Sequence, residues 1–405
     1  MEVHMHDHTI DVMKTRVLEN LDLENEVSDE SIINTIDSIL SDYCRSNYLS
    51  LEQRQEISRD IFCNLRKLDI LQELLDDDTV TEIMVNGPEN IFVEINGRVK
   101  RWNKSFAREE KLRDIIQQIV SFCNRVVNES SPIVDARLPD GSRINVVLKP
   151  IALNGPILTI RKFAKHRITM EKLIELGAIS SEAADFLTVL VKSKYNIFIS
   201  GGTGSGKTTF LNALSDYVPE DERIITIEDA AELQIKHVPN LVSLEARNGN
   251  GEGCVPIAIR DLIKSALRMR PDRIIVGEIR GEEAIDMLQA MNTGHDGSLS
   301  TGHANSSRDM LSRIETMVLM GVNIPLEAIR NQIGSAIDII VHLQRMSDRS
   351  RKVVAVEEIA GVEKGEIQLN TLYEFSGGKM RKVNSLINRE KLYSSGYNDQ
   401  ALGGD

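Results

Sequence analysis

The chain has 405 residues, of which 41% are hydrophobic and 27% are charged, and its formal net charge at pH 7 is −13. This composition is typical of a globular protein, and the length predicts two or three domains rather than one core. No apolar run approaches the ~20 residues of a membrane span, and the acidic balance argues against a general nucleic-acid binder.

The N-terminal sequence M-E-V-H-M-H-D-H lacks the charged and then apolar pattern of a signal peptide. It therefore predicts a cytoplasmic protein, which can still dock on a membrane protein. The four cysteines are scattered without a C-x-x-C pair, which indicates neither a zinc site nor a disulfide framework. For His4, His6 and His8, a frayed terminus is favoured over metal capture, because nothing nearby would fix the rings.

Residues 1–67 are expected to form an acidic helical prefix, with 14 acidic and 7 basic residues. Apolar residues recur at helical spacing from Ile33 to Tyr43, and Ser50 begins a second predicted helix, with Gln53 placed for a capping box. Two interpretations stay open. Either the helices cap the next domain, or their acidic face docks on the basic cytoplasmic loops of a membrane protein.

A second unit, residues 68–163, is predicted to be α+β. Apolar residues at helical spacing indicate a helix from Lys111 to Val127, and Asn96-Gly97 is a strong hairpin signal. Strands are predicted at 82–85, 91–95, 98–102, 143–148 and 157–163. Residues 164–169, which include a short basic run, are predicted to be a linker.

The most informative stretch is N-I-F-I-S-G-G-T-G-S-G-K-T-T-F, from Asn196 to Phe210. An apolar strand leads directly into the phosphate-loop spacing G-x-x-x-x-G-K-[ST]. The glycines let successive N–H groups turn toward a phosphate chain, and the following helix adds its positive end. Lys207 can reach the β- and γ-phosphate oxygens, and the Thr208 hydroxyl can bind Mg²⁺.

A Gly/Ser-rich turn that matches this spacing by chance is the alternative. The strand before it and the helix after it favour a nucleoside triphosphate site instead. The residues predicted to form that site are Gly201, Gly202, Thr203, Gly204, Ser205, Gly206, Lys207, Thr208 and Thr209.

The phosphate loop lies in a predicted α/β domain, residues 170–390. Helices at 256–269 and 282–292 alternate with strands, which favours a mostly parallel sheet. Strands are predicted at 197–199, 223–227, 273–277, 298–301, 338–343, 353–359 and 367–373. The tail, residues 391–405, is expected to be disordered.

Polar residues follow three of these strands, where an open α/β sheet places its ligands. Glu278 is the predicted acceptor that orients the attacking water, although Gly277 stands where a preceding Asp is usual. Glu228 and Asp229 could complete the Mg²⁺ shell through water, or they could cap a helix or turn.

Two histidines stand in matching T-G-H frames on either side of a predicted strand, and this repetition favours a site role, with His303 preferred over His295. Arginines also cluster between Arg260 and Arg280, and some are expected to form solvated salt bridges. An arginine supplied across a subunit interface could stabilise phosphoryl transfer, but the sequence does not indicate which arginine does so.

Four segments in order resemble the secretion ATPase superfamily. They are I-S-G-G-T-G-S-G-K-T-T, I-T-I-E-D-A-A-E-L, R-M-R-P-D-R-I-I-V-G-E-I-R-G-E-E-A and T-G-H-D-G-S-L-S-T-G-H-A-N-S, similar to its Walker A, Asp box, atypical Walker B and His box. Upstream, M-V-N-G-P-E-N-I-F-V-E, S-P-I-V-D-A-R-L-P-D-G-S-R-I-N and L-T-I-R-K-F resemble the CpaF branch, the Tad pilus assembly motors. The resemblance extends from Leu68 to about Phe375.

The resemblance implies a RecA-like P-loop NTPase domain that uses ATP and Mg²⁺. In the same family Gly followed by Glu is normal at positions 277 and 278. It also implies a ring-shaped homohexamer whose N-terminal domains close over the nucleotide, with Arg143 and Arg161 in segments whose arginines reach the phosphates. The implied partner is a polytopic inner-membrane platform protein, so the motor would work at the inner face of the cytoplasmic membrane.

The favoured function is therefore a motor ATPase that powers assembly of a Tad or type IV-like pilus. An ATPase of a type IV conjugation or effector secretion system is the alternative with the same chemistry. A nucleotide-gated scaffold with little turnover is a further possibility. A RecA-type DNA motor is disfavoured by the acidic charge and by the secretion motifs.

Overall fold

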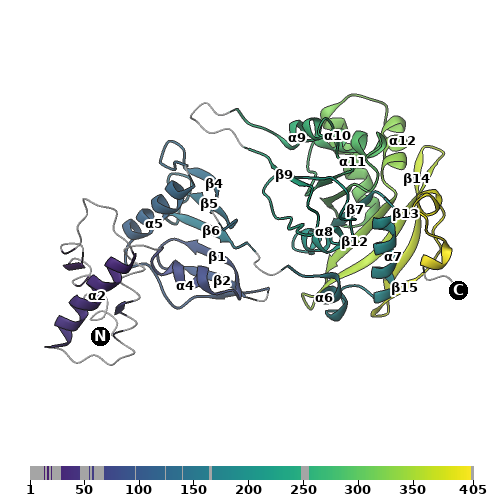
Figure 1. The fold of residues 1–405 in the computed structure, drawn as a ribbon. Helices are drawn as coiled ribbons and strands as arrows, with labels where there is room; N and C mark the ends of the chain where they lie inside the picture. The colour runs from purple at the N-terminus through teal and green to yellow at the C-terminus, as the bar shows by residue number, and fades with distance from the viewer. Residues whose placement is uncertain are drawn as a thin grey trace. The chain divides into compact units, whose positions relative to one another are not determined.

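The computed structural model describes residues 29–45, 68–95, 97–123, 125–138, 140–163, 167–247 and 255–402, together with the single positions Met13, Arg16, Val17, Asn20, Arg54, Ile57 and Ser58. The chain divides into two compact units, Met1–Lys165 and His166–Asp405 (Figure 1). The division falls inside the predicted linker.

Of the acidic prefix, the structure shows one long helix, α2 (Asp29–Cys44). Ile36 and Leu40 are fully buried, as their helical spacing predicts. The second expected helix, from Ser50, falls outside the described residues except for Arg54, Ile57 and Ser58. The N-terminal histidines also lie outside them.

The rest of the first unit is α+β, as predicted, and is built on a six-stranded sheet in which every neighbouring pair is antiparallel. Its order is β3 (Arg98–Arg101), β2 (Ile91–Ile95), β1 (Val80–Asn86), β6 (Ile157–Arg161), β5 (Arg143–Val147) and β4 (Ile133–Arg137). Helices α4 (Leu71–Asp76) and α5 (Glu109–Phe122) bury their apolar faces in the same core as the sheet.

The edge strand β4 was not predicted from the sequence. Its side chains are exposed or half-buried along its whole length, so it lacks the alternation of apolar and polar residues that reveals a strand. The antiparallel pairing with β5 therefore defines β4 as a strand, although its own sequence pattern does not indicate one.

The second unit contains a nine-stranded sheet whose strands from β12 to β9 are parallel, while β13, β14 and β15 are antiparallel additions. In spatial order the strands are β15 (Lys379–Lys382), β14 (Glu366–Ser376), β13 (Arg351–Glu363), β12 (Ile339–Arg345), β7 (Ile197–Gly201), β11 (Leu299–His303), β10 (Arg273–Val276), β8 (Ile224–Glu228) and β9 (Leu241–Glu245). The seven predicted strands are all present. The outer strands β9 and β15 are additional.

Helices cover both faces of this sheet (Figure 1). The central strand β7 shows why: Ile197 and Ile199 belong to one apolar core, and Phe198 between them belongs to the other. Helices α6 (Met170–Glu175), α7 (Ser181–Lys192) and α8 (Lys207–Ser215) pack in the first core. Helices α9 (Ile259–Ala266), α10 (Glu283–Asn292), α11 (Ser307–Gly321) and α12 (Leu326–Ala336) pack in the second.

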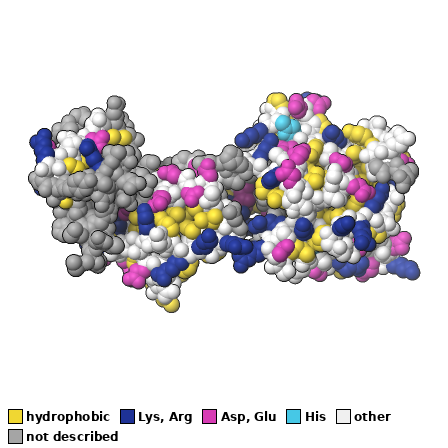
Figure 2. Space-filling model, turned by 90° about the horizontal axis from the view of Figure 1, so that it is seen from below, with side chains coloured by type: hydrophobic (Ala, Val, Ile, Leu, Met, Phe, Trp, Pro, Cys, Tyr) yellow, Lys and Arg dark blue, Asp and Glu magenta, His cyan; other side chains and the backbone are white. Residues whose placement is uncertain are grey.

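The surface of the described chain mixes charges of both signs. Figure 2 shows acidic and basic side chains interspersed with small apolar areas over one face. Among the helices that the structure describes, none combines the length and the apolar character that crossing a membrane would require.

The expectation of a disordered tail after Glu390 is wrong for the described residues up to Leu402. Helix α13 (Glu390–Ser394) and the 3-10 turn η1 (Asp399–Leu402) each place a leucine, Leu392 and Leu402, in the apolar core around β7. The polar residues between these leucines suggested disorder, but two apolar contacts and several polar ones hold the segment.

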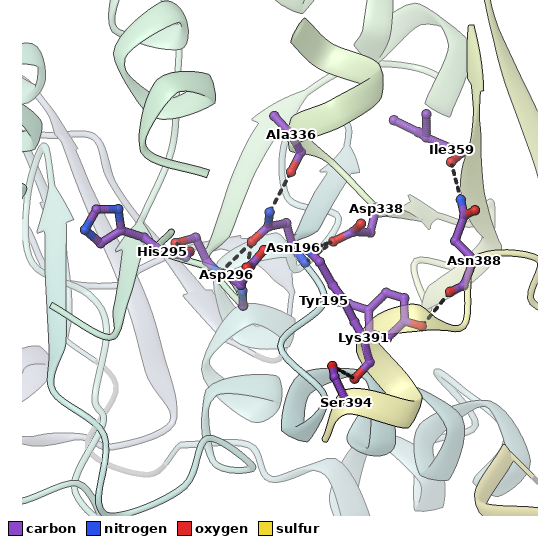
Figure 3. Close-up of polar contacts among 12 residues, drawn as sticks. Tyr195, Asn196, His295, Asp296, Ala336, Asp338, Ile359, Asn388, Lys391 and Ser394 are labelled. Atoms are coloured by element: carbon purple, nitrogen blue, oxygen red, sulfur yellow. Dashed lines mark hydrogen bonds and ion pairs between the residues drawn. The ribbon is translucent and has the colours of Figure 1, made fainter. Parts of the chain in front are cut away.

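Those polar contacts lie at the edge of the sheet where the parallel strands begin, here called the amino edge. Lys391 Nζ lies 2.7 Å from Asp338 Oδ2 and 2.7 Å from Asp296 Oδ1, so one cation bridges two carboxylates (Figure 3). Tyr195 Oη donates to the Asn388 carbonyl oxygen at 2.6 Å. The segment from Asn388 onward is thus tied to residues one to three positions before β7, β11 and β12.

Asn196 joins the same three strands. Its side-chain oxygen accepts from the N–H groups of Gly297 and Ser298, and its side-chain nitrogen donates to the Ala336 carbonyl. Its own N–H donates to Asp338 Oδ2 at 2.7 Å. Burial raises the pKa of the Asp338 carboxyl, and Lys391 opposes that shift.

A buried ion pair completes the amino edge. Arg273, the first residue of β10, is fully buried and binds Glu222 through Nε and Nη2. Its Nη1 donates to the carbonyl oxygens of Val191 and Gly297 at 2.7 and 3.2 Å. A guanidinium removed from water is tolerated there because hydrogen bonds and an opposite charge replace the solvent.

Candidate nucleotide-binding site

The phosphate loop connects the end of β7 to the start of α8, as the sequence predicts. Gly201 is required by close approach, because a Cβ there would lie 2.5 Å from the Leu343 carbonyl oxygen and 2.5 Å from Ser205 Oγ. Gly204 and Gly206 are required by conformation, since their φ angles are +68° and +94°. The backbone therefore has the form that turns N–H groups toward an anion.

The side chains of the loop also suit the binding of an anion. Ser205 Oγ is buried and has no hydrogen-bond partner within the described chain. Lys207 is the first residue of α8 and is only 7% exposed. Thr208 and Thr209 follow in the first helical turn and are half-buried, while Thr203 is exposed. The N–H groups of this turn have no intrahelical partners, so they favour a negative ligand.

A chain of polar groups runs from the loop along the edge where the parallel strands end, here called the carboxyl edge. Lys207 Nζ lies 3.2 Å from His303 Nδ1 and 3.2 Å from the Gly202 carbonyl oxygen. His303 Nε2 lies 3.0 Å from Glu278 Oε1, and Arg280 Nη2 lies 3.0 Å from Glu278 Oε2. The structure thus brings together three of the predicted groups, Lys207, His303 and Glu278.

The order of the strands explains why Lys207, His303 and Glu278 lie close together. Strands β7, β11, β10 and β8 are neighbours in the sheet, so their carboxyl ends adjoin although they are far apart in sequence. Thr301 Oγ1 donates to the Gly277 carbonyl at 2.7 Å, and the Ile279 N–H donates to the Thr301 carbonyl at 3.0 Å. These bonds hold the backbone on both sides of Glu278.

Burial shapes the charges of the site. It lowers the pKa of Lys207, and the negative charge of Glu278 opposes that shift. Burial also lowers the pKa of His303, and the nearby positive charge of Lys207 lowers it further. The imidazole is therefore neutral at pH 7, so it can accept a hydrogen bond on one nitrogen and donate from the other.

Glu228 is held by backbone groups. Its Oε1 accepts from the N–H groups of Glu232 and Leu233 at 2.8 and 3.0 Å, so it fixes the segment that follows β8. It also lies against Gly277, where a Cβ would come within 2.9 Å of Glu228 Cγ. The absence of the usual Asp at position 277 thus has a steric reason. Asp229 Oδ2 lies 3.5 Å from Arg280 Nη1.

His295 does not join the site. It precedes β11, at the amino edge of the sheet, whereas His303 ends the same strand at the carboxyl edge. Its Nδ1 lies 3.2 Å from the Ala290 carbonyl, and its ring points away from Asn196 (Figure 3). The matching T-G-H frames therefore place two histidines at opposite ends of one strand.

Arg143 and Arg161 lie in the first unit, on adjacent strands. Arg161 on β6 is directly opposite Arg143 on β5, and Arg143 is opposite Arg137 on β4. Directly paired residues share a face of the sheet, so three arginines stand in a row. Arg137 was not singled out from the sequence, because the row becomes visible only when the register of the unpredicted strand β4 is known.

Two further arginines were also missed. Arg345 and Arg351 end β12 and begin β13, and Arg351 Nε donates to the Gly204 carbonyl at 3.0 Å. They lie more than 130 residues from the phosphate loop in sequence. No local motif connects them with it.

Comparison with known proteins agrees with this geometry. The family model described as type II/IV secretion system protein matches residues 64–385. A Mycobacterium tuberculosis protein named for conjugal transfer is 34% identical over 332 residues, which cover 79% of this chain and 94% of the relative. The type IV secretion system protein PtlH of Bordetella pertussis is 33% identical over 315 residues, covering 71% and 93%.

Among solved structures, the pilus retraction motor PilT with bound ADP matches with a TM-score of 0.52 at 20% identity. The match covers 81% of this chain and 86% of that chain. At this identity the likeness concerns the fold, which is the RecA-like ATPase fold preceded by a smaller α+β domain. On the family match over most of its length, the chain belongs to the type II/IV secretion system protein family.

Proposed function

We propose that this protein is a motor ATPase that hydrolyses ATP to drive the assembly or export of macromolecules at the cytoplasmic membrane. One observation carries the proposal: Lys207, His303, Glu278 and Arg280 form a continuous polar chain directly beside a glycine-shaped phosphate loop. A loop that only bound phosphate would not need a carboxylate held between an imidazole and a guanidinium.

Each group has a distinct role in this proposal. The amides of residues 202–206 and the Lys207 ammonium bind the phosphates. Glu278 accepts a proton from the attacking water, and His303 and Arg280 orient its two carboxylate oxygens. The Thr208 hydroxyl, with nucleotide oxygens, holds Mg²⁺, which neutralises charge on the phosphates when bound. Glu228 lies against Gly277, next to Glu278, and contributes to that metal shell through water.

This assignment agrees with what the site contains. In the described part of the chain no group of three or more His, Cys, Asp or Glu side chains is placed to hold a metal ion. Thr208 offers a half-buried hydroxyl at the start of α8, and Glu228 and Asp229 offer carboxylates at the end of β8. A hydroxyl with outer carboxylates suits Mg²⁺, which retains waters and nucleotide oxygens.

The arginine row supports a role for the first unit. Arg143 and Arg161 lie directly opposite one another on neighbouring strands, and guanidinium groups bind phosphate oxygens through paired N–H donors. We propose that they reach the nucleotide phosphates when the first unit closes over the second in a ring-shaped homohexamer. Replacing both by Gln should lower turnover and leave the phosphate loop intact. The matched control is Arg98→Gln on exposed strand β3.

Two cargoes are supported by different observations. The upstream segments resemble Tad pilus motors, which favours pilus assembly through a polytopic inner-membrane platform protein. The names of two relatives, a conjugal transfer protein and PtlH of type IV secretion, favour a type IV secretion role instead. Neighbouring genes separate them: prepilin, prepilin peptidase and secretin genes favour the pilus.

The central test compares nucleotide binding with turnover in the purified full chain. We expect Lys207→Ala to lose ATP binding, and Glu278→Gln to keep it while turnover falls by about 10²–10⁴-fold, because the amide cannot accept the proton. Lys379→Ala on β15 and Glu374→Gln on β14, both at exposed positions, serve as matched controls. Near-normal turnover of the Glu278→Gln variant would remove Glu278 from this role. ATP binding by the wild type without turnover would instead support a nucleotide-gated scaffold.

A further inference from the structure

A basic hairpin lies beside the phosphate loop. Strands β12 and β13 are joined by residues 346–350, and the turn is closed by a hydrogen bond from Met346 N–H to the Ser350 carbonyl at 2.8 Å. The only acid in the turn, Asp348, accepts from the N–H and hydroxyl of Ser350. None of the three arginines, Arg345, Arg349 and Arg351, forms an ion pair within the described chain.

The hairpin is fixed in register with the loop. Strand β12 runs parallel to β7, with Leu343 paired to Gly201 at the point where the loop begins. From there Arg351 extends across the outside of the loop, and Nε donates to the Gly204 carbonyl at 3.0 Å. Its Cδ would lie 3.4 Å from a Cβ at Gly206, so the side chain packs along the loop as well.

This contact has a specific physical meaning. A phosphate loop binds its ligand through N–H groups that point inward, so its carbonyl groups need donors from other directions. Gly204 has φ +68°, and a glycine peptide can rotate over a wide range of backbone conformations. A charged donor on its carbonyl oxygen limits rotation of that peptide group, and charge-assisted hydrogen bonds are about twice as strong as neutral ones.

We propose that Arg351 is a positioning residue of the phosphate loop, which holds the Gly204 peptide in the orientation that binds the phosphates of a nucleoside di- or triphosphate. This inference rests on the proposed nucleotide binding. It adds a contribution from a residue 147 positions after Gly204 in the sequence, outside the motifs of the site. Arg345 Nη1 would lie 3.8 Å from a Cβ at Gly204, but among the described residues neither Arg345 nor Arg349 forms a hydrogen bond with the loop.

Two substitutions separate the hydrogen bond from the charge. In Arg351→Gln the amide nitrogen occupies the bond position of Arg Nε, so a donor remains and the charge is lost. In Arg351→Lys a carbon occupies that position, so the charge remains but the N–H donors move one bond further along the side chain, away from the position of Arg Nε. We expect the Kd values of both ATP and ADP to rise about tenfold for Arg351→Lys and to stay within about threefold of wild type for Arg351→Gln. At saturating ATP, kcat should be unchanged in both.

Arg349→Asn is the matched control, because it removes a charge from the same hairpin and Asn tolerates the φ of +70° found there. Its Kd should equal that of wild type. If Arg351→Lys binds normally while Arg351→Gln and Arg349→Asn bind weakly, general charge accounts for the effect and the positioning role is wrong. Equal binding by all variants would also overturn it.

A second measurement needs no nucleotide. Amide hydrogen exchange of residues 202–206 in the full chain should be faster for Arg351→Lys than for Arg351→Gln, and equal exchange contradicts the proposal. The two measurements together test nucleotide binding and the role of Arg351 separately. A wild-type chain that fails to bind ATP or ADP disproves the proposed function, whereas unchanged exchange in a chain that does bind disproves the role of Arg351.

Discussion

The two edges of the nine-stranded sheet treat polar side chains in opposite ways. At the amino edge, Arg273 and Asn196 are buried and every contact described for them ends on another part of the chain. At the carboxyl edge, Ser205 Oγ is buried without a partner among the described residues, and Lys207 is buried beside a neutral imidazole. This difference is what the proposed function predicts, with an amino edge that stabilises the fold and a carboxyl edge that binds a ligand.

The physical chemistry of the two edges follows from this. A buried charge that is fully hydrogen-bonded resists change, since removing one partner leaves the other charge without compensation. A buried charge that is partly satisfied raises the free energy of the folded chain, and a ligand that supplies the missing interactions lowers it. Substitutions at the two edges should therefore have opposite effects on stability.

The largest effect is expected for Arg273→Met. It removes the guanidinium that binds both oxygens of the buried Glu222 carboxylate and leaves only Lys194, whose Nζ lies 3.7 Å from Glu222 Oε1. The free energy of unfolding should therefore fall by about 3 kcal/mol or more. Urea unfolding followed by circular dichroism measures the change. The single Trp, Trp102, lies in the first unit, so its fluorescence provides an internal reference. The control Arg268→Met, at an exposed position, should change stability by about 0.5 kcal/mol at most. A loss no larger than in this control would contradict the assigned role of the amino edge.

Lys391→Met should have an intermediate effect that depends on pH. Loss of the cation between Asp338 and Asp296 is expected to cost about 2 kcal/mol at pH 8. The pKa of Asp338 is already above its ordinary value, and Lys391 holds it down. In the variant the folded state therefore takes up a proton more readily than the unfolded state, so the deficit should shrink as pH falls from 8 toward 5. Lys391→Arg keeps the charge and should show neither change. A deficit that grows on acidification would be evidence against this account.

At the carboxyl edge, Lys207→Met should not lower the free energy of unfolding, in contrast to the substitutions at the amino edge. Burial lowers the pKa of Lys207, which means that the ammonium is costly in the chain without nucleotide. We expect the variant to be as stable as wild type or more stable by up to about 1 kcal/mol in urea unfolding without ligand. A loss comparable with that of Arg273→Met would show that both edges are structural.

The smallest change in stability is expected for His303→Asn, and it should depend on pH. Its folded pKa lies below the ordinary value of 6.5, so the unfolded state binds the proton more readily. The associated stability is present above about pH 6.5 and is lost as the pH falls below that value. Between pH 8 and 5.5, wild type should therefore lose more stability than His303→Asn. If the free energy of unfolding changes equally with pH in both proteins, folding does not lower the pKa of His303.

The sequence predicts those parts of the site that depend on neighbours in the chain. The phosphate loop needs only the strand before it and the helix after it, and Glu278 and His303 are marked by their positions at strand ends. The contacts of Arg351 with Gly204 and of Glu228 with Gly277 could not be predicted, because they depend on strand order. The edge strands β4 and β9 lack a periodic pattern, and the tail looked disordered because its two anchoring leucines stand among polar residues.

The close approach of Glu228 to Gly277 has a consequence for how ATPase motifs are recognised. Two positions on neighbouring strands share one space, and a second acidic side chain at position 277 would overlap with the first. An acid missing from a motif on one strand can therefore be present on the adjacent strand at the same place in three dimensions. Motif searches that score each strand separately would count this as a defect, whereas the structure has a carboxylate beside position 277 that is attached to the neighbouring strand.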